Sequence, residues 1–319
     1  MNDLFHKARQ MIDNAQHIAL STHEDPDLDG LGSLLALESV LRAMGKNTYA
    51  FSIGPVSESL KILPHQIITN ELDPEKIDLV IGLDYGSPQR LEILRCYPEI
   101  KADFLTFDHH AVGEHKGFKI VDAEISSTAE MVHDFLNFIE APINSSVALC
   151  LLAGIVSDTG AFRYANTSAK TLKAAGELML KGASLAKISQ AGQNLNLDEK
   201  FSALNEVFDR IQTGARTDLV FAVINNELFN RLSAGLNEIG AASILSAAPE
   251  AKIAATLTEK TPGIFDVSLR SQQDRGVDVA RLAAAFGGGG HCLASGFRSS
   301  DSPEKIVAEI EQFLLSAAE

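Results

Sequence analysis

A short segment near the amino terminus carries three side chains that are able to bind a metal ion. His23, Asp27 and Asp29 lie within seven residues, and Gly30 and Gly32 follow. Imidazole and carboxylate groups without a thiolate suit Mn²⁺ or Mg²⁺ better than Zn²⁺ or Fe²⁺, and the glycines let the backbone turn tightly into a helix. The alternative is a polar turn in which an Asp or Ser side chain caps that helix. The segment alone leaves both interpretations open.

Three further segments place acidic or imidazole groups directly after an apolar run. Asp84 and Asp158 each follow such a run, and so does the triplet Asp108-His109-His110. A single Asp after a strand is usually a turn residue or a satisfied hydrogen-bonding group, but the coincidence of four segments is hard to explain in that way. Carboxylates that converge at one sheet edge repel each other unless cations neutralise them. The four segments together therefore predict a metal centre.

The elements that must position these groups follow from the apolar pattern of the first half of the chain. Short runs typical of buried strands alternate there with helical patterns. The strands are expected at residues 17–21, 79–83 and 104–107, and the helices at 34–44, 129–139 and 147–157. This alternation predicts an α/β fold with a mostly parallel sheet covered by helices on both faces, and ligands bind at the carboxyl ends of such strands.

The alternation restarts after a partly polar stretch, and 319 residues suit two domains better than one. Further strands are expected at residues 219–224, 252–257 and 264–269, and helices at 277–286 and 303–315. We predict an N-terminal domain over residues 1–185, a connector over 186–210 and a smaller C-terminal α/β domain over 211–319.

Composition and charge limit the classes of function. The chain has 45% hydrophobic residues, enough to bury a core, and 27 Lys and Arg against 42 Asp and Glu, a net charge of −15. The negative charge disfavours adhesion to long nucleic acids or anionic membranes. Three cysteines without a CxxC pair indicate neither a disulfide framework nor a thiolate zinc site. With no apolar signal segment and no apolar run of about 20 residues, we expect a cytoplasmic protein.

Two C-terminal segments suit anion binding. Four glycines precede His291, with a helical pattern before them and an apolar segment after them. A structured loop that offers backbone N–H groups to an anion is therefore favoured over a flexible linker. Arg270 ends an expected strand and suits bidentate recognition of a phosphate or carboxylate. Its alternative is a surface arginine that closes a hairpin.

The order and type of these motifs resemble the DHH superfamily of phosphoesterases. The resembling segments are HxxPDxD at residues 23–29, the strand-terminal Asp84, the triplet at 108–110 and Asp158-Thr159-Gly160. SLRS at 268–271 and GGGGHxxASG at 287–296 are similar to a C-terminal domain often attached to DHH catalytic domains, and family II pyrophosphatases lack that domain. The resemblance thus spans nearly the whole chain.

The resemblance implies a two-ion site, usually with Mn²⁺ and with Mg²⁺ as the alternative ion. The implied ligands are His23 and Asp27 for one ion, Asp29, His109 and Asp158 for the other, and Asp84 between them. By the same resemblance His110 lies over the substrate phosphate, and Asp108 orients the imidazoles without binding metal. The implied nucleotide-binding residues, which place the substrate in a cleft between the domains, are Ser268, Arg270, Gly288, Gly289, Gly290 and His291.

Size and layout are most similar to the bacterial group that degrades very short oligoribonucleotides and dephosphorylates 3′-phosphoadenosine-5′-phosphate (pAp). That similarity implies metal-activated hydroxide attack on phosphorus, with nucleoside 5′-monophosphates as products. The alternative is a phosphodiesterase acting on linear or cyclic dinucleotides such as pApA and cyclic di-AMP, and a non-catalytic nucleotide sensor is a more distant one. The resemblance also leaves a homodimer open.

Three positions outside the main motifs also carry predictions. The family usually has an Asn at the position of Gly113, in a DHHxxN pattern, so we expect this glycine to affect substrate preference or rate. The run Ser126-Ser127-Thr128-Ala129-Glu130 matches a family pattern, and we interpret it as a helix cap. His115 lies outside the motifs and is expected to be a surface or hydrogen-bonded core group rather than a metal ligand.

Overall fold

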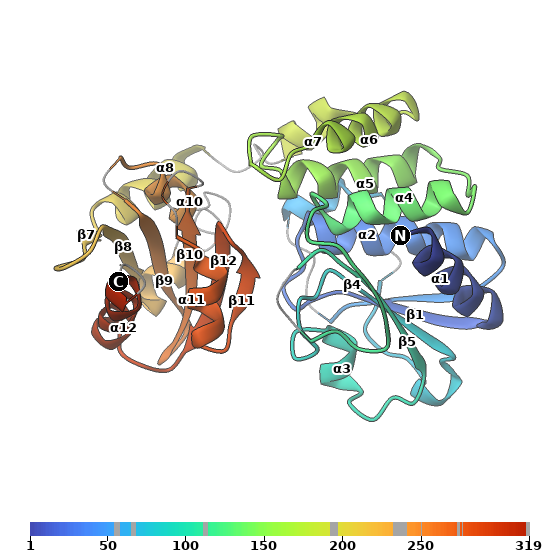
Figure 1. Cartoon of the computed structure of the whole chain (residues 1–319), viewed down its shortest axis with the longest axis horizontal. Helices are drawn as coiled ribbons and strands as arrows, with labels where there is room; N and C mark the ends of the chain where they lie inside the picture. Colours follow the sequence, from blue (N-terminus) through green and yellow to red (C-terminus); the bar gives the residue numbers. More distant parts are fainter. Residues whose placement is uncertain are drawn as a thin grey trace. The chain divides into compact units, whose positions relative to one another are not determined.

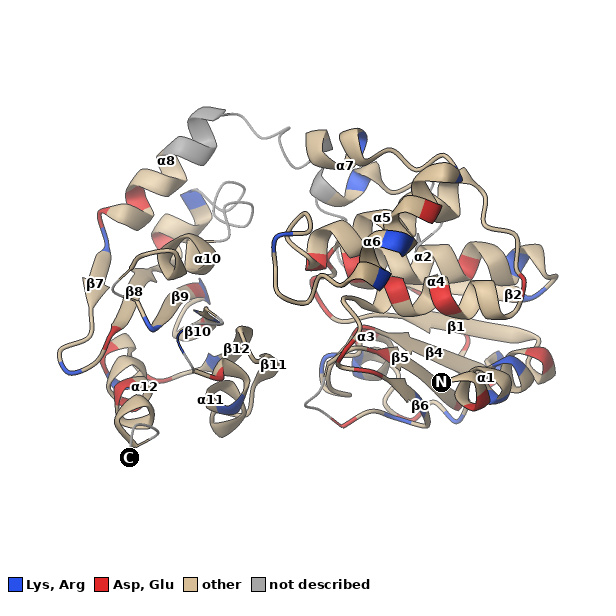
Figure 2. Ribbon diagram, turned by 45° about the horizontal axis from the view of Figure 1, so that its top comes forward, with Lys and Arg blue, Asp and Glu red and all other residues tan. Residues whose placement is uncertain are grey.

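The computed structural model describes residues 1–53, 58–64, 68–110, 114–191, 197–231, 241–249, 251–272, 275 and 277–316. Gly113 therefore lies outside the described residues. The chain divides into two compact units, Met1–Gln193 and Asn194–Glu319 (Figure 1). Acidic and basic positions are interspersed over both of them (Figure 2). No helix of the described residues combines the length and the apolar character needed to cross a membrane.

The first unit contains a six-stranded sheet in which every neighbouring pair is parallel. Its strands are β1 (His17–Ser21), β2 (Asn47–Phe51), β3 (Ile68–Thr69), β4 (Leu79–Leu83), β5 (Asp103–Asp108) and β6 (Phe118–Val121). The predicted parallel sheet is confirmed. The strand order is β3-β2-β1-β4-β5-β6, so the direction of chain progression reverses between β1 and β4. Such a reversal opens a crevice at the carboxyl ends of the two strands.

The two faces of this sheet are covered unequally (Figure 1). The helices are α1 (Asn2–Asn14), α2 (Leu28–Ala43), α3 (Glu92–Cys96), α4 (Thr128–Phe138), α5 (Ser145–Asp158), α6 (Ala169–Leu180) and α7 (Leu185–Ala191), with short 3₁₀ turns η1 (Glu58–Ile62) and η2 (Pro74–Lys76). A large apolar core joins one face to α1, α2, α4 and α5. A smaller cluster around Phe51 and Tyr85, with the short α3, covers the other face.

Two helices bring the sequence motifs into this core. The expected helix at 34–44 begins earlier, at Leu28, because the Asp27 side chain accepts hydrogen bonds from the N–H groups of Asp29 and Gly30. The second helix, α5, packs closely on α2, since a Cβ atom at Gly32 would lie 2.5 Å from the Cys150 carbonyl oxygen. This close contact fixes the start of α2, and with it Asp29, against the rest of the unit.

The second unit contains another six-stranded sheet, ordered β11-β12-β10-β9-β8-β7. Only β8 and β9 are parallel, so the sheet is mixed and mainly antiparallel. The elements are α8 (Leu197–Phe208), β7 (Ile211–Thr213), β8 (Leu219–Ile224), α10 (Ala241–Ser246), β9 (Ile253–Thr261), β10 (Ile264–Ser271), α11 (Val279–Ala285), β11 (Gly289–His291), β12 (Ala294–Ser299) and α12 (Pro303–Ser316). Ala203 and Val207 of α8 pack against β8, so part of the stretch expected as a connector belongs to the second core.

The glycine run forms a hairpin strand instead of the expected loop. Gly287 follows α11 with a φ of +74°, a left-handed conformation that commonly ends helices. The next residues enter β11, which pairs with β12 at the edge of the sheet. A Cβ atom at Gly288 would lie 2.2 Å from the carbonyl oxygen of Gly296. These two glycines therefore have structural roles, whatever they bind.

Replacing Gly288 by Ala is expected to lower the free energy of unfolding by about 1–3 kcal/mol, because the added methyl group forces the hairpin strands apart. Denaturant titration followed by circular dichroism measures this change. Cys292→Ser is the matched control, since Cys292 is exposed in the same hairpin. Equal stability of Gly288→Ala and wild type would contradict the close backbone approach.

Candidate metal centre

The sequence segments that carry acidic and imidazole groups meet at the carboxyl edge of the first sheet. β1 ends before His23, β4 before Asp84, and β5 runs into the triplet. The remaining groups come from helix ends, with Asp27 and Asp29 at the start of α2 and Asp158 at the end of α5. The side chains of His23, Asp29, Asp84, Asp108 and His109 are almost completely buried. The fold thus brings together all of the metal ligands that the resemblance implies.

One donor group forms around His23. Its Nδ1 lies 2.7 Å from the backbone oxygen of Glu24, and since a carbonyl oxygen only accepts, Nδ1 is the donor. Nε2 is then turned toward Asp27 Oδ1 at 3.8 Å and Asp84 Oδ2 at 3.9 Å. Ligand atoms of these three side chains lie within 4.8 Å of one another. A histidine held by one ring nitrogen and offering the other is the usual arrangement of a metal ligand.

Asp27 caps the helix and also lies beside His23, so its position is compatible with both interpretations of the sequence. Its Oδ1 accepts the N–H groups of Asp29 and Gly30 at 3.0 and 2.9 Å, so it caps α2. Its side chain is also about half exposed and faces His23. Capping therefore fixes the carboxylate at the mouth of the cluster and leaves its second oxygen for a ligand.

A second donor group forms around His109. Its Nε2 lies 3.1 Å from Asp158 Oδ2, 3.4 Å from Asp84 Oδ1 and 3.8 Å from Asp29 Oδ2. The Asp29 carboxylate is held in turn by the first turn of α4, because its two oxygens accept the N–H groups of Thr128 and Ala129, both at 2.8 Å. Ligand atoms of Asp29, Asp84 and His109 lie within 4.8 Å of one another.

Asp84 belongs to both donor groups. Its Oδ2 faces His23 and its Oδ1 faces His109, so one carboxylate lies between the two sets of ligands. Its backbone has a φ of +55°, which is uncommon for a residue other than glycine. Such strained conformations persist where the surrounding structure fixes them, often at functional sites. Asp84 is therefore the one side chain of the described residues that faces both His23 and His109.

The close carboxylates of the cluster shift the pKa values of their neighbours. Burial, together with Asp84 and Asp158, raises the pKa of Asp29 well above its ordinary value. Burial by itself lowers the pKa of His109, but Asp158 and Asp84 outweigh it and raise that pKa well above its ordinary value. The pKa of His23 likewise rises to about 9, because Asp27 and Asp84 outweigh burial and the nearby charge of Arg90.

The raised pKa of Asp29 reflects the buried carboxylates that lie close to it, and divalent cations would neutralise that negative charge. The donors are oxygen and imidazole nitrogen only, which suits Mn²⁺ or Mg²⁺. The residues present therefore fit a divalent metal centre.

Asp108 orients His110. Its Oδ1 accepts the Nδ1–H of His110 at 2.7 Å and the backbone N–H at 3.0 Å. Its Oδ2 accepts the N–H groups of Tyr85 and Gly86 at 2.9 and 2.8 Å. Although burial opposes ionisation, hydrogen bonds from the histidines hold the pKa of Asp108 well below its ordinary value. Both oxygens of Asp108 thus accept hydrogen bonds, and one of them holds the ring of His110.

Two contacts of the site are not specified by the sequence motifs. His115, expected to be a surface or hydrogen-bonded core group, is buried, with its Nε2 3.2 Å from Asp108 Oδ2. Thr128 follows Ser127, which caps α4 as expected by accepting the Glu130 N–H at 3.0 Å. The Thr128 hydroxyl itself donates to Asp84 Oδ1 at 3.1 Å. No spacing in the sequence signals either contact.

Replacing Thr128 by Val is expected to weaken Mn²⁺ binding about 10–100-fold, because the isosteric side chain loses the hydrogen bond that orients Asp84. Calorimetric titration with Mn²⁺ measures the affinity. Thr171→Val is the matched control: Thr171 is also buried and donates to a carboxylate, that of Glu130 at 2.9 Å, outside the cluster. If both variants lose affinity equally, the effect is general destabilisation.

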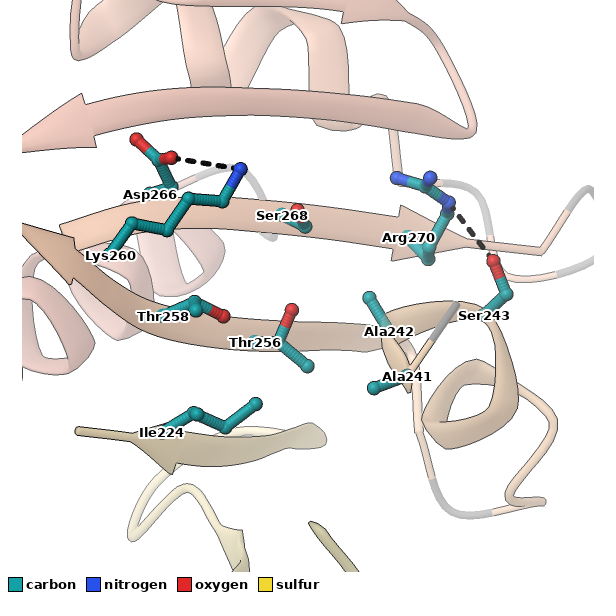
Figure 3. A pocket seen from close by; sticks show the side chains of 10 residues that line it. All are labelled: Ile224, Ala241, Ala242, Ser243, Thr256, Thr258, Lys260, Asp266, Ser268 and Arg270. Carbon is teal, nitrogen blue, oxygen red and sulfur yellow. Dashed lines mark hydrogen bonds and ion pairs between the residues drawn. The ribbon is translucent and has the colours of Figure 1, made fainter. Parts of the chain in front are cut away.

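In the second unit, Ser268 and Arg270 of β10 line a cavity of about 240 Å³ (Figure 3). Arg270 Nε donates to Ser243 Oγ at 3.2 Å, and Lys260 pairs with Asp266 at 3.4 Å. The other described lining residues are Ile224, Ala241, Ala242, Thr256 and Thr258.

The residues Gly288–His291, which the resemblance also implies for substrate binding, do not line this cavity. They lie two strands away, on the edge of the same sheet. The strand register nevertheless relates them to it, because Gly289 pairs with Gly296 and Gly296 pairs with Ser268. Paired residues point to the same face of a sheet, so Gly289 and Ser268 share one face.

Comparison with known proteins extends these observations. The model of the DHH family N-terminal domain matches residues 17–155. The bifunctional oligoribonuclease and PAP phosphatase NrnA of Thermus thermophilus is 30% identical over 285 residues, which cover 88% of this chain and 83% of that protein. The protein of the same name from Bacillus subtilis is 30% identical over 323 residues, covering 92% and 93%. An exopolyphosphatase-related protein from Bacteroides fragilis shares the fold, with a TM-score of 0.83 at 23% identity, covering 99% of this chain and 96% of that one.

The matched region contains β1, β4 and β5, the strands whose carboxyl ends build the cluster. The relatives extend the similarity across most of both units. Both comparisons therefore lead to the assignment that the triplet at the end of β5 first indicated. This chain belongs to the DHH family of phosphoesterases.

Proposed function

We propose that this protein hydrolyses very short oligonucleotides to nucleoside 5′-monophosphates and dephosphorylates pAp, with two Mn²⁺ ions bound at the metal centre. The observation that carries the proposal is the position of Asp84 between two donor groups. The names of the relatives from Thermus thermophilus and Bacillus subtilis support the choice of substrates.

The ligand assignment follows the two donor groups. His23 and Asp27 hold one ion, Asp29, His109 and Asp158 hold the other, and Asp84 contacts both. When bound, two divalent ions activate a water molecule and neutralise charge on the phosphate. The protein orients the ligands. The first turn of α4 holds Asp29, and the Thr128 hydroxyl holds Asp84.

His110 is the catalytic imidazole of this proposal. Asp108 holds it by Nδ1, so Nε2 is the nitrogen assigned to the substrate. From that position it stabilises charge on the phosphate or gives a proton to the leaving oxygen. The negative charge of Asp108 keeps the ring oriented while it does so.

The second unit supplies the nucleotide-binding groups. Arg270 and Ser268 present a cation and a hydroxyl at one cavity, and the edge strand with Gly288–His291 presents backbone N–H groups on the same sheet. A guanidinium binds phosphate oxygens in pairs. We therefore assign recognition of a phosphate or ribose group of the nucleotide to this sheet face.

Replacing Arg270 by Ala is expected to raise KM for pAp and for a dinucleotide about 10-fold or more, with a smaller change in kcat, because a charge-assisted contact to the substrate is lost. Steady-state kinetics measure both constants. Arg298→Ala is the matched control, since Arg298 lies on the neighbouring strand β12 and pairs with Asp266. An unchanged KM in Arg270→Ala would remove Arg270 from the substrate site.

The proposal is tested with pAp, pApA, a five-nucleotide RNA and cyclic di-AMP, each incubated with Mn²⁺ and with a chelator. Metal-dependent release of nucleoside 5′-monophosphates from the RNA, and of phosphate from pAp, is the expected result. Cleavage restricted to pApA or cyclic di-AMP would replace it with the dinucleotide phosphodiesterase. Tight nucleotide binding without any product would make the chain a sensor.

A further inference from the structure

Arg90 lies beside the metal centre but belongs to none of its motifs. Its backbone oxygen accepts the N–H of Glu24 at 3.0 Å, and the next residue, Leu91, forms an antiparallel bridge with His23. Glu92 N–H donates to the Thr22 oxygen at 3.0 Å. The chain from Arg90 onward is therefore fixed alongside the segment that carries the first metal ligand.

Gly86 connects Arg90 with His110. A Cβ atom at Gly86 would lie 3.7 Å from Arg90 Nη1 and 3.6 Å from His110 Cγ. The guanidinium and the imidazole thus border the same small space, and glycine keeps that space open. Gly86 is itself fixed, because its N–H donates to Asp108.

The charge of Arg90 is available for a ligand. The side chain is exposed, and within the described part of the chain its guanidinium has no carboxylate within ion-pair distance. Arg95, on the same segment, pairs with Glu24 instead. A guanidinium donates two parallel hydrogen bonds to a phosphate and stays charged at every working pH. The carboxylate-rich cluster beside it repels a phosphate, and a cation at this place offsets that repulsion.

We propose that Arg90 and His110 form a subsite for the phosphate group that is cleaved, with Arg90 donating to two of its oxygens. This inference rests on the proposed phosphohydrolase function and adds a residue to it. The ligand class is a phosphate monoester or diester, bound next to the metal centre and distinct from the group bound by Arg270 in the second unit. Because its backbone is anchored beside the metal centre, Arg90 also stabilises negative charge that develops during hydrolysis.

The test is calorimetric titration of adenosine 5′-monophosphate, a product, into Mn²⁺-loaded wild type, Arg90→Ala, Arg90→Lys and Arg95→Ala. The Kd is expected to rise about tenfold or more in Arg90→Ala. Arg90→Lys recovers part of the affinity, because lysine restores the charge but not the paired geometry. Arg95→Ala and the Mn²⁺ affinity of all four proteins are expected to stay at wild-type values.

The outcomes separate this inference from the proposed function. Equal Kd values in wild type and Arg90→Ala overturn the subsite, and so does a wild type that cleaves pAp but does not bind the monophosphate. Binding that depends on Arg90, in a protein that cleaves none of the four nucleotides, overturns the proposed function and keeps the subsite. A fall in Mn²⁺ affinity in Arg90→Ala would make Arg90 a structural residue of the metal centre.

Discussion

Replacing Asp84 by Asn is expected to lower kcat/KM by about 10³-fold or more and to remove high-affinity Mn²⁺ binding. Asn has the same shape and still offers an oxygen to the Thr128 hydroxyl, but it lacks the negative charge that the proposed two-ion centre requires. Charge stabilisation by bound metal ions amounts to several kcal/mol of the barrier. Steady-state kinetics with pAp and calorimetric Mn²⁺ titration measure the two losses.

The same substitution has an opposite effect on stability. In the presence of a chelator, Asp84→Asn is expected to melt at the same temperature as wild type or higher, because one negative charge leaves a buried group of carboxylates. Asp122→Asn is the matched control: Asp122 directly follows β6 and lies outside the cluster. An Asp84→Asn protein that keeps wild-type turnover would overturn the metal centre, and one that fails to fold would contradict the expected repulsion.

The sheet of the first unit could be predicted because parallel strands are buried on both faces. β1 and β4 are continuous apolar runs that end in polar residues, so their limits at residues 17–21 and 79–83 agree with the sequence. β2 and β6 mix polar and apolar residues near the sheet edges and carry no such signal. The strands that hold the metal ligands are therefore also the strands that a sequence reveals best.

The contacts that orient the ligands could not be predicted in the same way. Thr128 meets Asp84 across 44 positions of sequence, and His115 contacts Asp108 although no motif links the two residues. Arg90 reaches the site through a bridge between His23 and Leu91. Such pairs form only in the folded chain. A single sequence, taken on its own, does not reveal which distant residues will contact each other.

The glycine run at residues 287–290 shows a second limit of prediction from sequence. Gly-rich composition predicts conformational freedom or close approach, and it does not say what approaches. From the sequence, the glycines are expected to allow an anionic ligand to come close to the backbone. In the structure, the carbonyl oxygen of Gly296 on β12 comes close to Gly288, and the segment is a strand.

Replacing His110 by Ala is expected to lower kcat about 10²–10⁴-fold while Mn²⁺ affinity stays near that of wild type, the usual loss when a general acid or base is removed. The ring Nδ1 lies 3.6 Å from Asp84 Oδ1 but donates to Asp108 Oδ1 at 2.7 Å, which leaves Nε2 for the substrate contact that we propose. Kinetics and calorimetry on the same protein separate the two roles. His133→Gln is the control, since His133 is also buried and its Nε2 contacts Asn137, away from the cluster.

The double variant decides whether Asp108 acts through His110. Asp108→Asn alone is expected to reduce kcat, because an amide no longer holds the ring with a full charge. Combined with His110→Ala, it is expected to cause little further loss, since residues that act as a unit give non-additive effects. Additive losses would mean that Asp108 has a second role, such as binding metal itself, and loss of Mn²⁺ affinity in His110→Ala would make His110 a ligand. The coupling therefore tests whether Asp108 acts only through His110, the histidine that we assign to the phosphate.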